Sequence, residues 1–204
     1  MVRTSATTIP APVKGLNDRD AIADMDPQYA VILKNWWPGP SKVAVRKGSL
    51  THADGMTGDV ESIFEYNPPS GIVEMYAAAN GDIYDVTSSG TVGSPVVTGK
   101  SNDRYQDVPV TTPGGSYLYL FNGEDKPLLY DGSTWIEIDG SSTPSITGIA
   151  DTSLIVDGLV FKGRMYLVEK NSMNLWYLPV ASIGGAASAI DMGQIFQRGG
   201  YIVT

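Results

Sequence analysis

The chain has 204 residues and no cysteine, so it can bury about 70% of its unfolded surface without disulfides, and thiolate catalysis and cysteine-based metal sites are excluded. The formal net charge of −8, from 22 acidic and 14 basic residues, argues against tight nucleic-acid binding, which depends on contacts between basic side chains and phosphates. Because the sequence has neither an apolar stretch of about 18 residues nor the basic-then-apolar start of a signal peptide, we expect a soluble protein without a membrane anchor.

Residues 1–60 are predicted to form an extended N-terminal arm that ends in a first strand. Prolines prevent regular structure across most of this arm: Pro10, Pro12, Pro27, Pro38 and Pro40. Residues 18–25 place three apolar side chains on one helical face, which predicts a helix of at most about two turns. The alternation over residues 43–48 predicts a strand that could enter the first of the repeats that follow.

One motif occurs three times between residues 75 and 177. In each copy an apolar strand with tyrosine at its second position leads through a polar turn to a second aromatic strand: 75–78 with 83–86, 118–121 with 128–130, and 165–168 with 175–177. The copies recur about every 45 residues, and the alternation over 134–139 predicts an additional outer strand. The first turn holds Asn80-Gly81, which suits a tight hairpin because both residues accept a positive φ.

A repeat of this length with several strands in each copy is typical of propeller blades. The sequence therefore predicts an all-β fold in which residues 61–204 form a partial β-propeller of about three blade-like repeats. Closure takes at least about four blades, so we expect further blades beyond residue 204 or strands supplied by neighbouring subunits. The alternative is a β-sandwich whose hairpins are alike by chance.

No catalytic group, cofactor or metal is expected from the residues. His52 is the only histidine, which excludes multi-histidine metal sites and histidine-paired catalysis. Residues 94–101 end like a phosphate-binding loop, but Ser94 occupies the position of the first required glycine. Residues 130–135 are similar to the aspartate box of sialidase-like propellers, a turn element, but lack the residue expected between Asp131 and Gly132. We therefore expect that the protein is not an enzyme.

Short motifs occur in a specific order along the chain: 12–17, 35–38 and 43–48 in the arm, then 161–166 and 196–200 in the repeats. This order resembles that of tail hub or nozzle proteins of short-tailed bacteriophages, most of which are several times longer. The resemblance implies a propeller-bearing virion protein, made in the host cytoplasm, that assembles as a homo-oligomer, typically a hexamer. It also implies contacts with portal, adaptor and tail fibre proteins, and a channel that DNA passes through during ejection without specific binding.

The residues expected to contact a partner or a second subunit lie in the arm: Asn35, Trp36, Trp37, Pro38 and Arg46. Large aromatic side chains and arginine contribute much of the energy of interfaces, and an arm without a core has little other use for two tryptophans. The alternative is that Trp36 or Trp37 caps the first blade of the same chain.

Two other functions compete with the structural role. A carbohydrate-binding propeller or receptor-binding virion protein would use the many tyrosines and tryptophans to stack on sugar rings. A propeller-type glycosidase would need a pair of carboxylates in a central pocket, which no sequence feature supplies.

Overall fold

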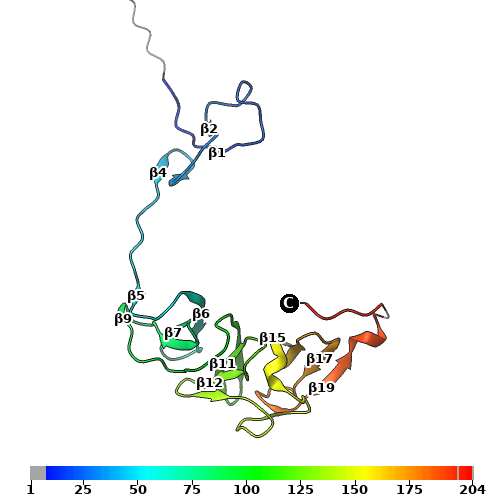
Figure 1. Cartoon of the computed structure of the whole chain (residues 1–204). Coiled ribbons are helices and arrows are strands. Elements are labelled where there is room, and N and C mark those ends of the chain that lie inside the picture. Colours follow the sequence, from blue (N-terminus) through cyan, green and yellow to red (C-terminus); the bar gives the residue numbers. More distant parts are fainter. Residues whose placement is uncertain (1–7, 197, 204) are drawn as a thin grey trace, which may run out of the picture. The chain divides into compact units, whose positions relative to one another are not determined.

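The computed structural model describes residues 8–196 and 198–203 and divides into two compact units, one up to Leu50 and one from Thr51 onward (Figure 1). Within the described residues there is no α-helix, and the regular structure is β-strand except for two short 3₁₀ helices, η1 (Thr152–Leu154) and η2 (Met192–Gln194). The prediction of an all-β fold is confirmed. The division between the units falls before the hypothesised boundary at residue 60, because β5 (Ala53–Asp54) pairs with β9 (Gly90–Thr91) in the second unit.

The first unit contains two small sheets. β1 (Gly15–Leu16) pairs in parallel with β2 (Tyr29–Ala30), and β3 (Trp36–Pro38) forms a hairpin with β4 (Val43–Val45). The strand predicted over 43–48 therefore pairs inside the first unit and does not enter the repeats, so that part of the prediction is wrong. That prediction rests only on the alternation of apolar and polar residues, which indicates a strand but does not identify the strand that it pairs with.

The short helix predicted over residues 18–25 is not formed. This segment contains a single turn, in which the N–H of Asp24 donates to the carbonyl of Ala21 at 3.0 Å. Just before it, the side chain of Asn17 accepts hydrogen bonds from the backbone N–H groups of Arg19 and Asp20. Such local bonds from an asparagine compete with helical ones, and Pro27 prevents extension on the other side.

The second unit is built on three antiparallel meanders in chain order (Figure 1). The first meander comprises β6 (Val60–Tyr66), β7 (Glu74–Ala79) and β8 (Asp82–Asp85). The second comprises β10 (Gln106–Thr112), β11 (Gly115–Phe121), β12 (Leu128–Tyr130) and β13 (Trp135–Glu137). The third comprises β15 (Ile155–Phe161), β16 (Arg164–Glu169), β17 (Asn174–Tyr177) and β19 (Ser188–Asp191). Between the second and third meanders, β14 (Ile146–Thr147) pairs in parallel with β18 (Gly185–Ala186).

All three hairpins expected from the repeated motif are confirmed as β7–β8, β11–β12 and β16–β17. The outer strand expected within 134–139 is present as β13, which pairs with β12. In the first hairpin Asn80 and Gly81 both have a positive φ, of 54° and 82°, as the expected tight turn requires.

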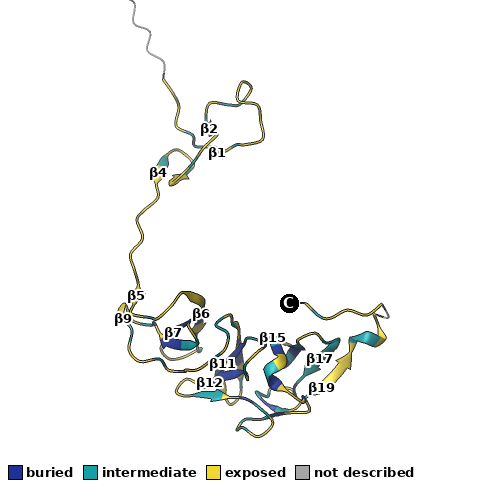
Figure 2. Ribbon diagram, in the orientation of Figure 1, coloured by how far each residue is buried: buried dark blue, intermediate teal, exposed yellow. Residues whose placement is uncertain are grey.

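Successive meanders pack face to face, and their interfaces form the core of the second unit. The second half of β11, residues 118–121, is buried on both faces, as the dark blue part of its ribbon in Figure 2 shows. Leu118 and Leu120 on one face pack with Tyr76 of the first meander. On the other face, Tyr119 and Phe121 join a cluster with residues of the third meander. Side chains at successive positions of a strand point to opposite sides of the sheet. The single strand β11 therefore contributes to the interface with the first meander and to the interface with the third.

Candidate functional site

The five residues expected to contact a partner lie together in and beside one hairpin of the first unit: Asn35, Trp36, Trp37, Pro38 and Arg46. The backbone N–H of Arg46 donates to the carbonyl of Asn35 at 2.7 Å, where the two strands leave the hairpin. Asn35 has a φ of 60°, a left-handed conformation that asparagine adopts more readily than most residues. The β3–β4 hairpin therefore joins these positions into one element.

The two tryptophans point to opposite faces of this hairpin, because side chains alternate along a strand. Trp36 lies, with Pro12 and Ile32, beside a cavity of about 330 Å³ within the first unit. Trp37 lies on the other face and is 72% exposed. Trp36 thus has partial packing inside its own unit, whereas Trp37 presents most of its ring to the surroundings.

The first unit buries very little of its apolar surface. Of the residues described up to Leu50, only Gly15 is buried. Large apolar side chains exposed in this unit accompany the two tryptophans: Ile9, Leu16, Ile22, Val31, Ile32, Val45 and Leu50. A unit that leaves most of its large apolar side chains exposed is a candidate region for contact with another protein.

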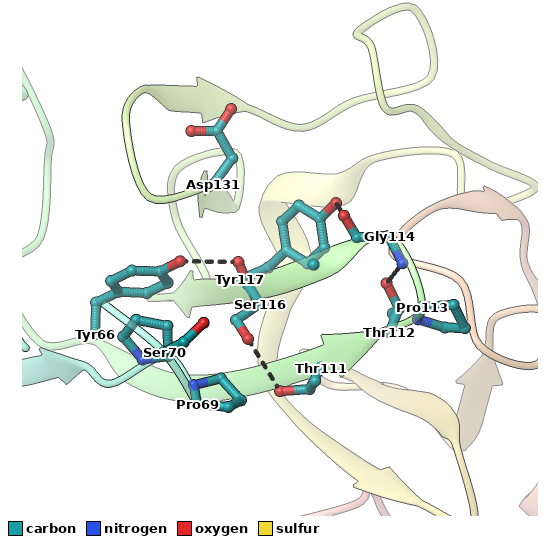
Figure 3. Close-up of a pocket in the computed structure, with 12 residues that line it drawn as sticks. Tyr66, Pro69, Ser70, Thr111, Thr112, Pro113, Gly114, Ser116, Tyr117 and Asp131 are labelled. Atoms are coloured by element: carbon teal, nitrogen blue, oxygen red, sulfur yellow. Dashed lines mark hydrogen bonds between the residues drawn. The ribbon is translucent and has the colours of Figure 1, made fainter. Parts of the chain in front are cut away.

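A second candidate site is an open cleft in the second unit (Figure 3), with a volume of about 630 Å³. Its walls are the end of β6, the loop after it, the β10–β11 turn and the start of the turn after β12. Hydroxyl-bearing, aromatic, proline and glycine residues line it together with one carboxylate: Tyr66, Pro68, Pro69, Ser70, Thr111, Thr112, Pro113, Gly114, Gly115, Ser116, Tyr117 and Asp131.

Hydrogen bonds hold the aromatic side chains of this cleft in place. The Tyr66 hydroxyl donates to the backbone carbonyl of Ser116 at 3.1 Å, which ties the first meander to the second (Figure 3). Its pKa is raised, mainly by burial and then by the charges of Glu74 and Asp131. The hydroxyl of Tyr117 donates to the carbonyl of Gly114 at 3.3 Å. Neither hydroxyl is therefore free, and Tyr117, which is partly exposed, offers more ring surface to the cleft than the buried Tyr66.

The carboxylate of Asp131 is hydrogen-bonded within the turn that this residue begins. Its carboxylate accepts hydrogen bonds from the backbone N–H groups and the hydroxyls of both Ser133 and Thr134, at 2.8 to 3.1 Å. Burial acts to raise the pKa of Asp131, but these hydrogen bonds outweigh it and the pKa is lowered. The carboxylate is therefore charged at neutral pH and already bonded, which suits a turn element better than a general acid.

Sequence reasoning did not single out Tyr66 or Tyr117. A usable signal was the pair of proline- and glycine-containing turns that follow β6 and β10, since both belong to the same position of the repeat. Within residues 8–196 and 198–203, no group of three or more histidine, aspartate or glutamate side chains is placed to hold a metal ion. No helix in this described part is long and apolar enough to span a membrane.

Comparison with known proteins returned no match of any kind. No family model matches the chain, and neither a curated protein nor a solved structure matches it.

Proposed function

We propose that this chain is a structural subunit of a bacteriophage tail nozzle or hub. It would form a homo-oligomeric ring, a hexamer by the resemblance described above, below the portal and adaptor proteins. DNA would pass through this ring during ejection without being bound specifically. A net charge of −8 suits the wall of such a conduit, because basic contacts along the path would retard sliding DNA.

The repeated meanders support this assignment at the level of the fold. Three meanders with a common strand order pack in series through their faces, as the blades of a propeller do. We infer that they are the blades of a partial propeller. A rigid array of this kind is suited to building a wall, in which each unit contacts its neighbours.

The main structural support for the proposal is the exposure of Trp37 on the β3–β4 hairpin. Trp37 keeps most of its ring exposed on a unit that has almost no core of its own. Truncating a tryptophan at the centre of an interface commonly costs about 2 kcal/mol or more, which is more than a tenfold change in affinity. A subunit that attaches to a second copy or to an adjoining ring would use such a surface.

Electron microscopy and native mass spectrometry of the purified chain test the proposal. We expect closed rings, and we expect capture by portal or adaptor proteins. Trp37→Ala should weaken one of these associations at least tenfold, whereas Ser41→Ala, in the turn of the same hairpin, should leave both unchanged. A chain that remains monomeric and shows no affinity for portal or adaptor proteins would contradict the proposal.

The cleft between the first and second meanders supports one alternative, a carbohydrate-binding protein or the receptor-binding component of a virion. Tyrosine rings and hydroxyl groups arranged around an open cavity are the groups that sugar rings stack on and bond to. Titration with a panel of glycans tests this alternative. Saturable binding that is lost in Tyr117→Ala but retained in Tyr201→Ala, an exposed tyrosine outside the cleft, would favour it over the ring.

A further inference from the structure

The third meander exposes positions that the second meander buries. Val108 of β10 and Leu159 of β15 occupy the same place in the repeat, because each lies opposite the repeated tyrosine, Tyr119 or Tyr166. Val108 is 6% exposed because the third meander covers it, whereas Leu159 is 51% exposed. Equivalent side chains therefore differ only in whether a following meander packs on them.

Two residues further along the same strands the contrast is repeated. Val110 lies opposite Tyr117, and Phe161 lies opposite Arg164, which makes the two positions equivalent. Val110 is 4% exposed and Phe161 is 55% exposed. We call this surface the trailing face and define it by these exposed or partly exposed side chains: Leu159, Phe161, Arg164, Tyr166 and Tyr177.

Within the second unit, the described residues cover only one edge of the trailing face. After η2, the N–H of Ile202 donates to the carbonyl of Ser172 at 3.1 Å, and this segment borders a groove of about 380 Å³ beside β17. Leu159 and Phe161, on the first strand of the meander, do not line that groove. The first strand is thus the open part of the face.

At the other end of the series, the first meander has an open face of complementary character. Ile63 of β6 lies opposite Ala77, and Glu65 lies opposite Met75, on the side that faces away from the second meander. The segment around β5 and β9 covers the part of this side formed by β7 and β8, and leaves a groove of about 270 Å³ that Ile63 lines. We call the surface of Ile63, Glu65 and Met75 the leading face.

We propose that the trailing face of one copy of this chain binds the leading face of a second copy, so that the inter-meander interface is repeated between molecules. Both faces are open at the first strand of their meander, and each combines apolar side chains with one charged side chain. Their charges are also complementary, with Arg164 on the trailing face and Glu65 on the leading face. Within the described residues, neither of these two side chains makes an ion pair.

The proposed contact joins two different surfaces, so it is heterologous. Contacts of this type generate a closed ring when the rotation between copies permits closure, and an open filament when it does not. The inference rests on the proposed function only in requiring that copies of the chain associate. It assigns that association to the second unit and not to the tryptophan hairpin.

Cross-linking provides the direct test, because the wild-type chain has no cysteine. Glu65→Cys and Arg164→Cys each introduce a single thiol, and a short bis-maleimide should link the two variants to each other when they are mixed. Each variant alone should give little dimer. Mixing Glu65→Cys with Ser141→Cys, an exposed position away from both faces, sets the background. Linkage no greater than this background, or efficient linkage of Arg164→Cys to itself, overturns the inference.

Substitutions of the trailing face give a second readout. Phe161→Glu should weaken self-association, measured by analytical ultracentrifugation, at least tenfold, while Val180→Glu, an exposed apolar position outside the face, should not. Thermal unfolding of both variants checks that they remain folded. If Arg164→Glu and Glu65→Arg each weaken association, the double variant should restore it.

The two proposals fail in distinguishable ways. Rings that persist in Phe161→Glu but are lost in Trp37→Ala overturn the trailing-face contact and leave the proposed function standing. A wild-type chain that stays monomeric at all concentrations also overturns the contact. The proposed function falls only if that monomer, in addition, shows no affinity for portal or adaptor proteins.

Discussion

The two units use aromatic side chains in opposite ways. In the second unit, Tyr119 and Phe121 are fully buried and their rings stack with centroids 5.4 Å apart. In the first unit, Trp36 and Trp37 are both exposed, on a hairpin with almost no core beneath it. Aromatic content therefore does not decide whether a segment forms a core. What decides it is whether another sheet packs on the same face, which the three meanders provide for each other.

The largest expected effect lies where the meanders meet. Phe121→Ala removes a fully buried ring from the interface between the second and third meanders, and should lower the free energy of unfolding by about 3–5 kcal/mol. Urea denaturation measures the change. Phe161→Ala, measured at a protein concentration at which the chain is monomeric, is the matched control, because the same ring is removed from an exposed position. A similar loss there would contradict the contrast between covered and open faces.

A smaller effect is expected at the turn of the first hairpin. Gly81 has a φ of 82°, and a Cβ atom added there would lie 2.6 Å from the backbone carbonyl oxygen of Lys100. Gly81→Ala should therefore destabilise the second unit by about 2 kcal/mol or more, from the strained φ and the collision together. Gly93→Ala meets no neighbouring atom within 4 Å and does not have a positive φ, so its unfolding should stay close to wild type.

The sequence predicted the second unit far better than the first. The repeated tyrosine, the Asn80-Gly81 turn and the alternation around Trp135 are local signals, and each corresponds to a strand or turn that the structure contains. The predictions failed where two local structural preferences compete, and where the pairing of a strand depends on residues far away in the sequence. The helix predicted near Asp18 is absent because the Asn17 side chain accepts hydrogen bonds from the backbone there. The strand at Val43 pairs with β3 in the first unit and not with the repeats.

The candidate sites show the same division. Trp36 and Trp37 stood out because two tryptophans between prolines are unusual in composition. The cleft at Tyr66 and Tyr117 did not, because it forms only when two meanders lie side by side. The sequence signal for it is indirect: the proline- and glycine-containing turns after β6 and β10 occupy the same position of the repeat. The faces of the third meander could be compared with those of the second only once the register of the strands was known.

A hydrogen-bonded carboxylate gives a pH-dependent test of the second unit. Asp125 accepts hydrogen bonds from the N–H and hydroxyl of Ser101 and from the amide of Asn122, at 2.8 to 2.9 Å. Burial raises its pKa, but these bonds lower it more, so the pKa in the folded state lies below the ordinary value. A depressed pKa means that the stabilisation is complete above the unfolded value of about 4 and is lost as the pH falls through the folded value.

Asp125→Asn should therefore lower the free energy of unfolding by about 1 kcal/mol at pH 7, and the difference from wild type should shrink as the pH falls below about 4. Urea denaturation at a series of pH values measures this difference. A gap between the two proteins that stays constant down to pH 2, or widens there, would show that the Asp125 carboxylate does not make these bonds in solution.

The smallest effect on stability is expected from the most conspicuous side chain. Trp37→Ala removes a ring that is 72% exposed, so it leaves no cavity, and the unfolding free energy of the isolated chain should change by no more than about 0.5 kcal/mol. Trp36→Ala should cost somewhat more, because that ring borders a cavity with Pro12 and Ile32. Thermal unfolding and association should be measured on the same preparations.

If Trp37→Ala destabilises the isolated chain as strongly as Phe121→Ala does, its ring belongs to a core and the contrast between the two units is lost. Weakened association at unchanged stability would instead assign Trp37 to an interface, which no stability measurement alone could do.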